Sequence, residues 1–210
     1  MMSNMVKPET IQVMEERHSV KVYEKGYIIP QEDMETILSA ANAAPSAWNL
    51  QHWKFLVIDD EAKKQELLPI AYNQSQISDS SFVVAVLGDL EANRNAAPVY
   101  DSLVEAGSMT QEIRDTLVNQ INGAYQSSDV ARDSANRNAS YAAMNLMLAA
   151  KALGYDTCPM GGFDAAAFME HFNVPARYIP TLLISVGKAA KPAYASGRFS
   201  LEEAVIKNSF

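Results

Sequence analysis

The stretch "NASYAAMNLMLAAKALG" (residues 138–154) closes the longest helical pattern of the chain, which begins near residue 130. Alanine, methionine and leucine place apolar side chains around most of its circumference, and Gly154 supplies a helix terminator. A helix that is apolar all round must be buried on more than one side. One domain built from 210 residues does not readily bury both sides, whereas a helix-mediated dimer does.

Shorter patterns along the chain indicate the fold class. Few strands are predicted and helices separate them, which favours an α/β or α+β fold with a mixed central sheet. No internal repeat or low-complexity linker divides the chain, so residues 1–210 are predicted to form one domain. The expected helices cover residues 9–16, 30–44, 61–73, 99–121, 130–154 and 165–172, and the expected strands cover residues 53–59, 80–89 and 178–188.

Composition excludes several classes of function. The net charge of −8 argues against nucleic-acid binding, which needs a basic surface to displace counterions. The single cysteine, Cys158, allows no intrachain disulfide and no thiolate-based metal site. The N-terminal residues lack the apolar segment of a signal peptide, and no run reaches the roughly 18 apolar residues of a membrane span. A cytoplasmic protein that binds neither membrane nor nucleic acid is expected.

Familiar catalytic motifs are missing from the sequence. It contains no GxSxG elbow, P-loop, HExxH helix or GxGxxG fingerprint, and its three histidines lie in separate predicted elements. A hydrolase or a metalloenzyme is therefore disfavoured. Chemistry carried by a bound cofactor becomes the more attractive reading.

Two segments combine polar groups in ways that suit a cofactor. Residues 17–21, "RHSVK", offer two cations, an imidazole and a hydroxyl that together can grip a phosphate; the alternative is a solvated helix end. Residues 44–55, "APSAWNLQHWKF", place Ser46, Asn49 and Gln51 between two tryptophans. That arrangement suits a flat ligand with polar edges, and its alternative is a loop whose tryptophans fill the core.

Three further features complete the candidate set. "AYNQSQ" carries Asn73 and Gln76, which can face the edge of a heterocycle or simply end a helix. In "DTCPMGGFD" (156–164), a short strand or loop, adjacent glycines permit close approach of a ligand; the alternative is a positive-φ turn capped by Asp164. Arg198 stands isolated in "ASGRFSL" as a second candidate phosphate cation.

Taken together, the chain resembles the nitroreductase family of FMN-dependent oxidoreductases. The resemblance runs from about residue 12 to the C-terminus and rests on the order of "RHSVKVY", "APSAWNLQHWKFLVI", "NLMLAAKALGYDTCPMGGFD" and "YIPTLLISVGKA". It implies an α+β, nitroreductase-like fold with a mixed, mostly antiparallel sheet flanked by helices, in an intertwined homodimer with FMN at the subunit interface. Residues 98–129 are the least family-like part and either cover the flavin or form a surface helix pair, while residues 189–210 form an extended tail.

The resemblance also assigns roles to residues. The segment that binds the phosphate, ribityl chain and pyrimidine edge of FMN is matched by Arg17, His18, Ser19 and Lys21. The loop that reaches FMN from the other subunit is matched by Pro45, Ser46, Asn49 and Gln51. The remaining flavin contacts are matched by Asn73, Gln76, Met160, Gly161, Gly162 and Arg198. Trp53 then begins a core strand, and Trp48 lies either beside the flavin or at the dimer interface.

The implied activity is ping-pong reduction of nitroaromatics, quinones or related small acceptors, with hydride passing from NADH or NADPH through flavin N5. No side chain acts as nucleophile; Lys21 and the backbone N–H near Gly162 tune the flavin. Departures from the family pattern, such as His52 in place of a frequent proline, leave open another flavin reaction, dehalogenation or enone reduction. A low-turnover flavin carrier or sensor is the further alternative.

Overall fold

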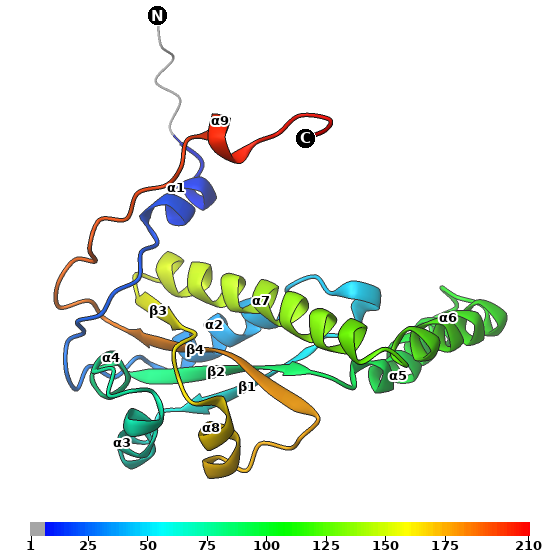
Figure 1. Cartoon of the computed structure of the whole chain (residues 1–210), viewed down its shortest axis with the longest axis horizontal. Helices are drawn as coiled ribbons and strands as arrows, with labels where there is room; N and C mark the ends of the chain where they lie inside the picture. Colours follow the sequence, from blue (N-terminus) through cyan, green and yellow to red (C-terminus); the bar gives the residue numbers. More distant parts are fainter. Residues whose placement is uncertain (1–6) are drawn as a thin grey trace, which may run out of the picture.

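A computed structural model describes residues 7–210, which form a four-stranded sheet with helices against both faces (Figure 1). The strands are β1 (Trp53–Ile58), β2 (Phe82–Asp89), β3 (Asp156–Met160) and β4 (Tyr178–Gly187), in the order β1-β2-β4-β3. The helices are α1 (Glu9–Glu16), α2 (Gln31–Asn42), α3 (Glu61–Ile70), α4 (Gln76–Asp79), α5 (Ala96–Glu105), α6 (Gln111–Ala124), α7 (Ser128–Ala152), α8 (Ala165–His171) and α9 (Leu201–Ala204).

The sheet is almost entirely antiparallel. All three pairings between the named strands run antiparallel, and a single parallel bridge, Ser19 with Thr157, adds the mixed character that the sequence predicted. β2 is buried along its whole length, as its continuous apolar run indicated. Alternate β2 side chains enter two separate cores, with Val84 and Val86 facing one and Val83 and Ala85 facing the other.

The predicted long helix is α7, and it covers one face of the sheet together with α2 (Figure 1). Alanines at the contact, including Ala139, Ala142 and Ala143, bring the helix axis close to the strands. Gly154 follows the helix with φ +81°, which confirms its role as terminator. The opposite face of the sheet is covered by α3, α4 and α8 (Figure 1).

The helical stretch predicted for residues 99–121 is divided in the structure. α5 ends at Glu105, Gly107 takes φ +68°, and α6 starts after Thr110, whose hydroxyl accepts a hydrogen bond from the Ile113 N–H. We call this helix pair, residues 96–124, the excursion, because it projects beyond the end of the sheet (Figure 1). Tyr100 and Ile121 pack at its base against Leu50, which ties the excursion to the loop before β1.

The last segment, residues 189–210, leaves the sheet as an extended tail, as predicted. Ala190 still donates a backbone hydrogen bond to Val22, but beyond it the aromatic and aliphatic side chains are exposed. Tyr194 and Phe199 are each more than four-fifths exposed. Among residues 7–210, no helix combines the length and apolar character needed to cross a membrane, and no cluster of three or more candidate metal ligands occurs.

His52 lies in a buried polar cluster at the junction of β1, β2 and the excursion. Its side chain is fully buried, and neither ring nitrogen has a hydrogen-bond partner among the residues described. The ring stacks over Tyr125 at 6.5 Å between centroids, and the His52 carbonyl accepts from the Asp89 N–H. Asp89 itself is held by Arg177 through two hydrogen bonds of 2.8 and 2.6 Å. Burial lowers the pKa of His52 to about 4, although the Asp89 carboxylate opposes the shift.

Gly187 provides a test of the packing at the end of β4. A Cβ atom there would lie 2.8 Å from Cδ1 of Tyr23, whose ring is 2% exposed and whose hydroxyl bonds Ser185. Because that ring has no room to move, we expect Gly187→Ala to lower the free energy of unfolding by about 1–3 kcal/mol. Urea unfolding measures the change. Gly123→Ala in α6, where a Cβ meets nothing, is the control and should be neutral or slightly stabilising; equal losses would contradict the packing argument.

The buried histidine predicts a pH dependence of stability. Unfolded His52 binds a proton with a pKa near 6.5, whereas the folded residue resists protonation until about 4. Because the unfolded chain then binds more protons, this residue's contribution to folding falls as pH drops from 6.5 toward 4. We expect His52→Phe to gain stability relative to the wild type over that range. Urea unfolding of both proteins at several pH values tests this, and parallel stability curves would refute it.

Candidate cofactor site

A short backbone pairing brings the predicted phosphate cations to the sheet. Ser19 bridges Thr157 in parallel, and the Val20 N–H donates to the Thr157 carbonyl at 3.0 Å. Arg17, at the end of α1, and Lys21 therefore lie beside β3. Burial raises the pKa of the Cys158 thiol, and the nearby positive charges of Lys21 and Arg17 oppose that rise. Both cations thus act on the same strand.

Arg17 has an unsatisfied donor. Its Nη1 atom is enclosed by protein and has no hydrogen-bond partner among residues 7–210, and no ion pair neutralises the guanidinium within that range. An enclosed donor left unpaired costs free energy, so a native structure normally supplies an acceptor. Arg17 is therefore prepared to receive an anion. His18 is half-buried and Ser19 is exposed beside it.

The turn between α3 and α4 lies against the two glycines that follow β3. The Gln74 side chain donates to the Gly162 carbonyl at 2.8 Å, and the Asp164 N–H donates to the Ile70 carbonyl at 2.9 Å. Tyr72 and Asn73 both adopt left-handed backbone conformations, with φ of 54° and 56°, which turn the chain toward the glycines. Asn73 is exposed there, as a contact to an external ligand requires.

Two predicted contact residues point inward instead. Gln76 is 5% exposed, and its amide nitrogen lies 3.4 Å from Sδ of Met160 and 3.1 Å from Oε1 of Gln74. Met160 is 4% exposed and belongs to the core beneath α3 and α8. Gln76 therefore supports Gln74, which the sequence analysis did not single out. The signal was present in "AYNQSQ", where Gln74 directly follows Asn73.

Gly161 and Gly162 face open space. A Cβ atom at either position would meet nothing within 4 Å, and neither residue has a positive φ. The alternative of a positive-φ turn is therefore wrong, although Asp164 does cap α8 by accepting from the Ala167 N–H at 3.0 Å. Neither glycine N–H donates a hydrogen bond within the described chain. The backbone here is exposed and free to bind a flat group.

The loop of residues 45–51 forms a second set of polar groups. Ser46 Oγ accepts from the Gln51 N–H at 3.0 Å, and the Gln51 amide donates to the Asn49 carbonyl at 3.0 Å. Asn49 and Gln51 both take positive φ, of 55° and 50°, and both are exposed. Pro45 precedes them as an exposed residue after α2. Trp53 begins β1 at 3% exposure, which confirms its place in the core.

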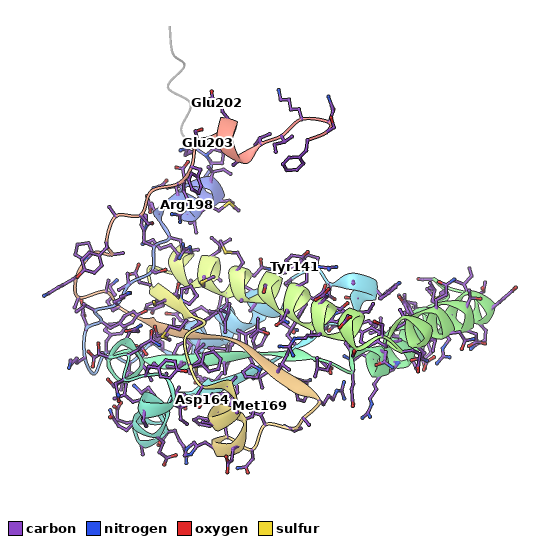
Figure 2. All side chains as sticks on the ribbon, in the orientation of Figure 1. Tyr141, Asp164, Met169, Arg198, Glu202 and Glu203 are labelled. Carbon is purple, nitrogen blue, oxygen red and sulfur yellow. The ribbon has the colours of Figure 1, made fainter. Side chains whose placement is uncertain are left out.

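These two sets lie at opposite edges of the sheet within one chain. The loop leads into β1, whereas the cations and glycines flank β3, and β1 and β3 are the two edge strands. Three strand spacings, about 14 Å, separate these two strands. Arg198 belongs to neither set: it is exposed on the tail, apart from Asp164 in Figure 2, and its guanidinium donates to the Gly197 carbonyl. One chain therefore presents two half-sites, which we call the cation half-site (residues 17–21, 73–76 and 160–162) and the loop half-site (residues 45–51).

Comparison with known proteins shows the family to which the chain belongs. The Nitroreductase family matches residues 14–188. The Bacillus subtilis (strain 168) protein named "Putative NAD(P)H nitroreductase YodC" is 54% identical over 92% of this chain and 96% of its own length. The crystal structure of a "putative nitroreductase in complex with FMN" from Exiguobacterium sibiricum 255-15 is 38% identical, with a TM-score of 0.87 over 96% of this chain and 98% of that one.

A relative with a different printed activity also matches. The "CLA biosynthesis enone reductase" of Lactiplantibacillus plantarum is 30% identical over 93% of this chain and 93% of its own length. Its likeness extends through the same segments that carry both half-sites, because the matched region spans nearly the whole chain. On the family match and on these identities, the chain belongs to the nitroreductase family, an oxidoreductase family.

Proposed function

We propose that the protein is an FMN-dependent NAD(P)H oxidoreductase that works as a homodimer and reduces small acceptors such as nitroaromatics or quinones. The observation that carries the proposal is the enclosed, unpartnered Nη1 of Arg17 beside β3, the strand that leads into the open backbone of Gly161 and Gly162. A cation without an acidic partner can bind a phosphate, and an exposed backbone can lie against a flat ring. Together they fit a flat ring that carries a phosphate. The single buried cysteine suits the reducing cytoplasm.

The cation half-site would hold most of the cofactor. Arg17 would pair with the phosphate, His18 and Ser19 would contact the neighbouring hydroxyls, and the open backbone of the glycines would face the ring. When bound, FMN supplies the hydride chemistry that no side chain of the protein provides. Arg198, exposed and free of ion pairs within residues 7–210, can add a second phosphate cation once the tail is ordered on a partner.

Two groups would tune the electronics of the ring. Lys21 is exposed and forms no ion pair within residues 7–210, so its charge is available to favour a negative charge on the pyrimidine edge. The free N–H of Gly162 can donate to a ring nitrogen, while Gln74 holds the next peptide of the chain by donating to the Gly162 carbonyl. Preorganised donors of this kind need no rearrangement during the reaction, which is why they are effective.

A dimer would join the two half-sites. A groove of about 270 Å³ lies between α1, α2 and α7 and is lined by Val13, Ala40, Leu148 and Ala149. On α7, Tyr141, Met144, Leu148 and Ala152 recur at helical spacing along one exposed face, and Figure 2 shows Tyr141 on the outer side of that helix. A second copy of the chain on this face would bury it and bring its loop half-site to the cation half-site.

The excursion would then limit which acceptors enter. It makes hydrogen bonds with the loop half-site, from Tyr100 to the Trp48 carbonyl, and its neighbour Asn95 bonds the Leu50 carbonyl. Because the loop would reach the partner's cofactor, we propose that the excursion covers that cofactor rather than one held by its own chain. The enone reductase relative favours reduction of an activated double bond as the second candidate reaction.

Loss of Arg17 should weaken cofactor binding. Because hydrogen bonds to charged groups contribute about 1.5–3 kcal/mol, we expect Arg17→Ala to raise the Kd for FMN about tenfold to a hundredfold. Titration of apoprotein by flavin fluorescence measures it. Lys63→Ala, which removes an exposed charge on α3, is the control and should leave the Kd unchanged. A wild-type protein that takes up no FMN would refute the proposed function.

Lys21 should affect the reduction potential of the flavin more than it affects the stability of the fold. Lys21→Ala removes a positive charge that favours the reduced, anionic ring, so we expect a lower flavin reduction potential at unchanged thermal stability. Spectroelectrochemical titration of the FMN-loaded protein gives the potential. If Lys21→Ala and Lys63→Ala have the same potential as the wild type, Lys21 does not tune the ring.

A charge on the exposed face of α7 should both separate the subunits and release the cofactor. Met144 is 40% exposed, so Met144→Asp leaves the core intact while placing a charge in the proposed interface. We expect a monomer by light scattering and a large loss of FMN affinity. Ile113→Asp, the same type of change at a more exposed position on α6 (51%), should leave the dimer intact. A monomeric wild type, or a Met144→Asp dimer, would contradict this interface.

A further inference from the structure

The two tryptophans of the chain, five residues apart, have opposite environments. Trp53 is 3% exposed, and its indole N–H donates to Oδ1 of Asn42 at 2.9 Å. Trp48 is 39% exposed, and its indole N–H donates no hydrogen bond within residues 7–210. Trp53 is thus a satisfied core residue, whereas nothing in the chain explains the exposed position of Trp48.

The backbone at Trp48 is also strained. Its φ and ψ of 53° and 17° lie in the left-handed region, which costs an L-residue about 1–2 kcal/mol and is uncommon for bulky side chains. Asn49 and Gln51 share that conformation, so the strain extends over the loop half-site. Strain of this kind persists only where surrounding contacts determine the backbone, and such positions cluster at functional sites.

The contacts that determine this backbone all avoid the indole. The Ala47 N–H donates to Oδ1 of Asn138 at 2.8 Å, and the Tyr100 hydroxyl donates to the Trp48 carbonyl at 3.2 Å. Asn138 is 2% exposed on α7, and Tyr100 is 7% exposed on α5, so both anchors are fixed by the core. The Leu50 N–H also donates to the Ala47 carbonyl at 3.1 Å, so the peptide on each side of Trp48 is held, and the side chain is directed outward as a consequence.

We propose that Trp48 is a specificity-determining residue that forms one wall of the acceptor site and stacks on flat, electron-poor acceptors such as quinones and nitroaromatics. This inference rests on the proposed function. The indole is the most electron-rich side-chain ring, and it follows directly on Ser46 and Ala47 and precedes Asn49 in the loop that would border the cofactor. Its free N–H can in addition donate to a nitro or carbonyl oxygen of the acceptor.

A steady-state comparison of the FMN-loaded variants Trp48→Phe and Trp48→Leu tests this wall. An aromatic pair contributes about 0.5–1.5 kcal/mol beyond its buried area, so Trp48→Leu should lower kcat/KM for a planar naphthoquinone about three- to tenfold. Trp48→Phe keeps a ring and should stay within about twofold of the wild type. For ferricyanide, which offers no ring to stack, both variants should match the wild type.

Trp48→Gly separates the acceptor role from a role in folding. Glycine accepts φ of 53° without strain, so this variant should keep or raise thermal stability while losing quinone selectivity as Trp48→Leu does. Flavin reduction by NAD(P)H is measured for all three variants by stopped flow without acceptor, so that the kcat/KM for each acceptor is compared separately from this first step.

Three results would overturn the inference. Unchanged quinone kinetics in Trp48→Leu and Trp48→Gly would show that the indole does not contact the acceptor. An equal loss with ferricyanide and quinone would indicate a general effect on the flavin. Dissociation of the dimer or release of FMN in these variants would place Trp48 in the subunit interface instead. A wild type that binds FMN and reduces ferricyanide keeps the proposed function intact in each of these cases.

Discussion

The hydrogen bond from the Val20 N–H to the Thr157 carbonyl is the contact on which the site depends. It joins a segment near the N-terminus to the edge strand β3, which would otherwise end the sheet with unpaired backbone groups. Ser19 and Val20 make this pairing with β3. It fixes the positions of Arg17, which precedes them, and of Lys21, which follows them. Two cations are therefore held by backbone geometry rather than by acidic partners, which leaves their charges available to an external anion.

Much of the fold can be predicted from the local pattern of apolar residues in the sequence. β2 was predictable because a strand buried on both faces must be apolar at every position, and α7 because its alanines and leucines recur around the whole helix. The break between α5 and α6 was not predicted, although Gly107 and Thr110 in "AGSMT" are typical stop and start signals of helices. Only the positive φ of Gly107 and the cap at Thr110 divide the two helices. α4 was also missed, since four residues carry no periodicity.

The candidate site, like the fold, was predictable from the sequence only in part. Residue chemistry left a solvated helix end and a turn as alternatives at Arg17, Lys21 and the two glycines, and the family resemblance implied their roles in binding FMN. Which amide faces the glycines was not readable, because the left-handed turn at Tyr72 and Asn73 decides it. That turn directs Gln74 to the Gly162 carbonyl and buries Gln76 beneath it. The conformation of two residues thus decides which of the two glutamines lies against the glycines.

In the proposed function, division of the site between two edges of the sheet would link cofactor binding to assembly of the dimer. If each cofactor needs the cation half-site of one subunit and the loop half-site of another, only the dimer binds it tightly, and binding stabilises the dimer by mass action. The backbone strain at Trp48, Asn49 and Gln51 would also enter the free energy of binding and assembly. The chain maintains this strained conformation without a ligand, because Asn138 and Tyr100 hold the loop. A loop held rigid in advance loses little entropy when it closes over a partner's ligand. In the proposed dimer, the buried anchors beneath the loop would therefore determine how well the two subunits form one site.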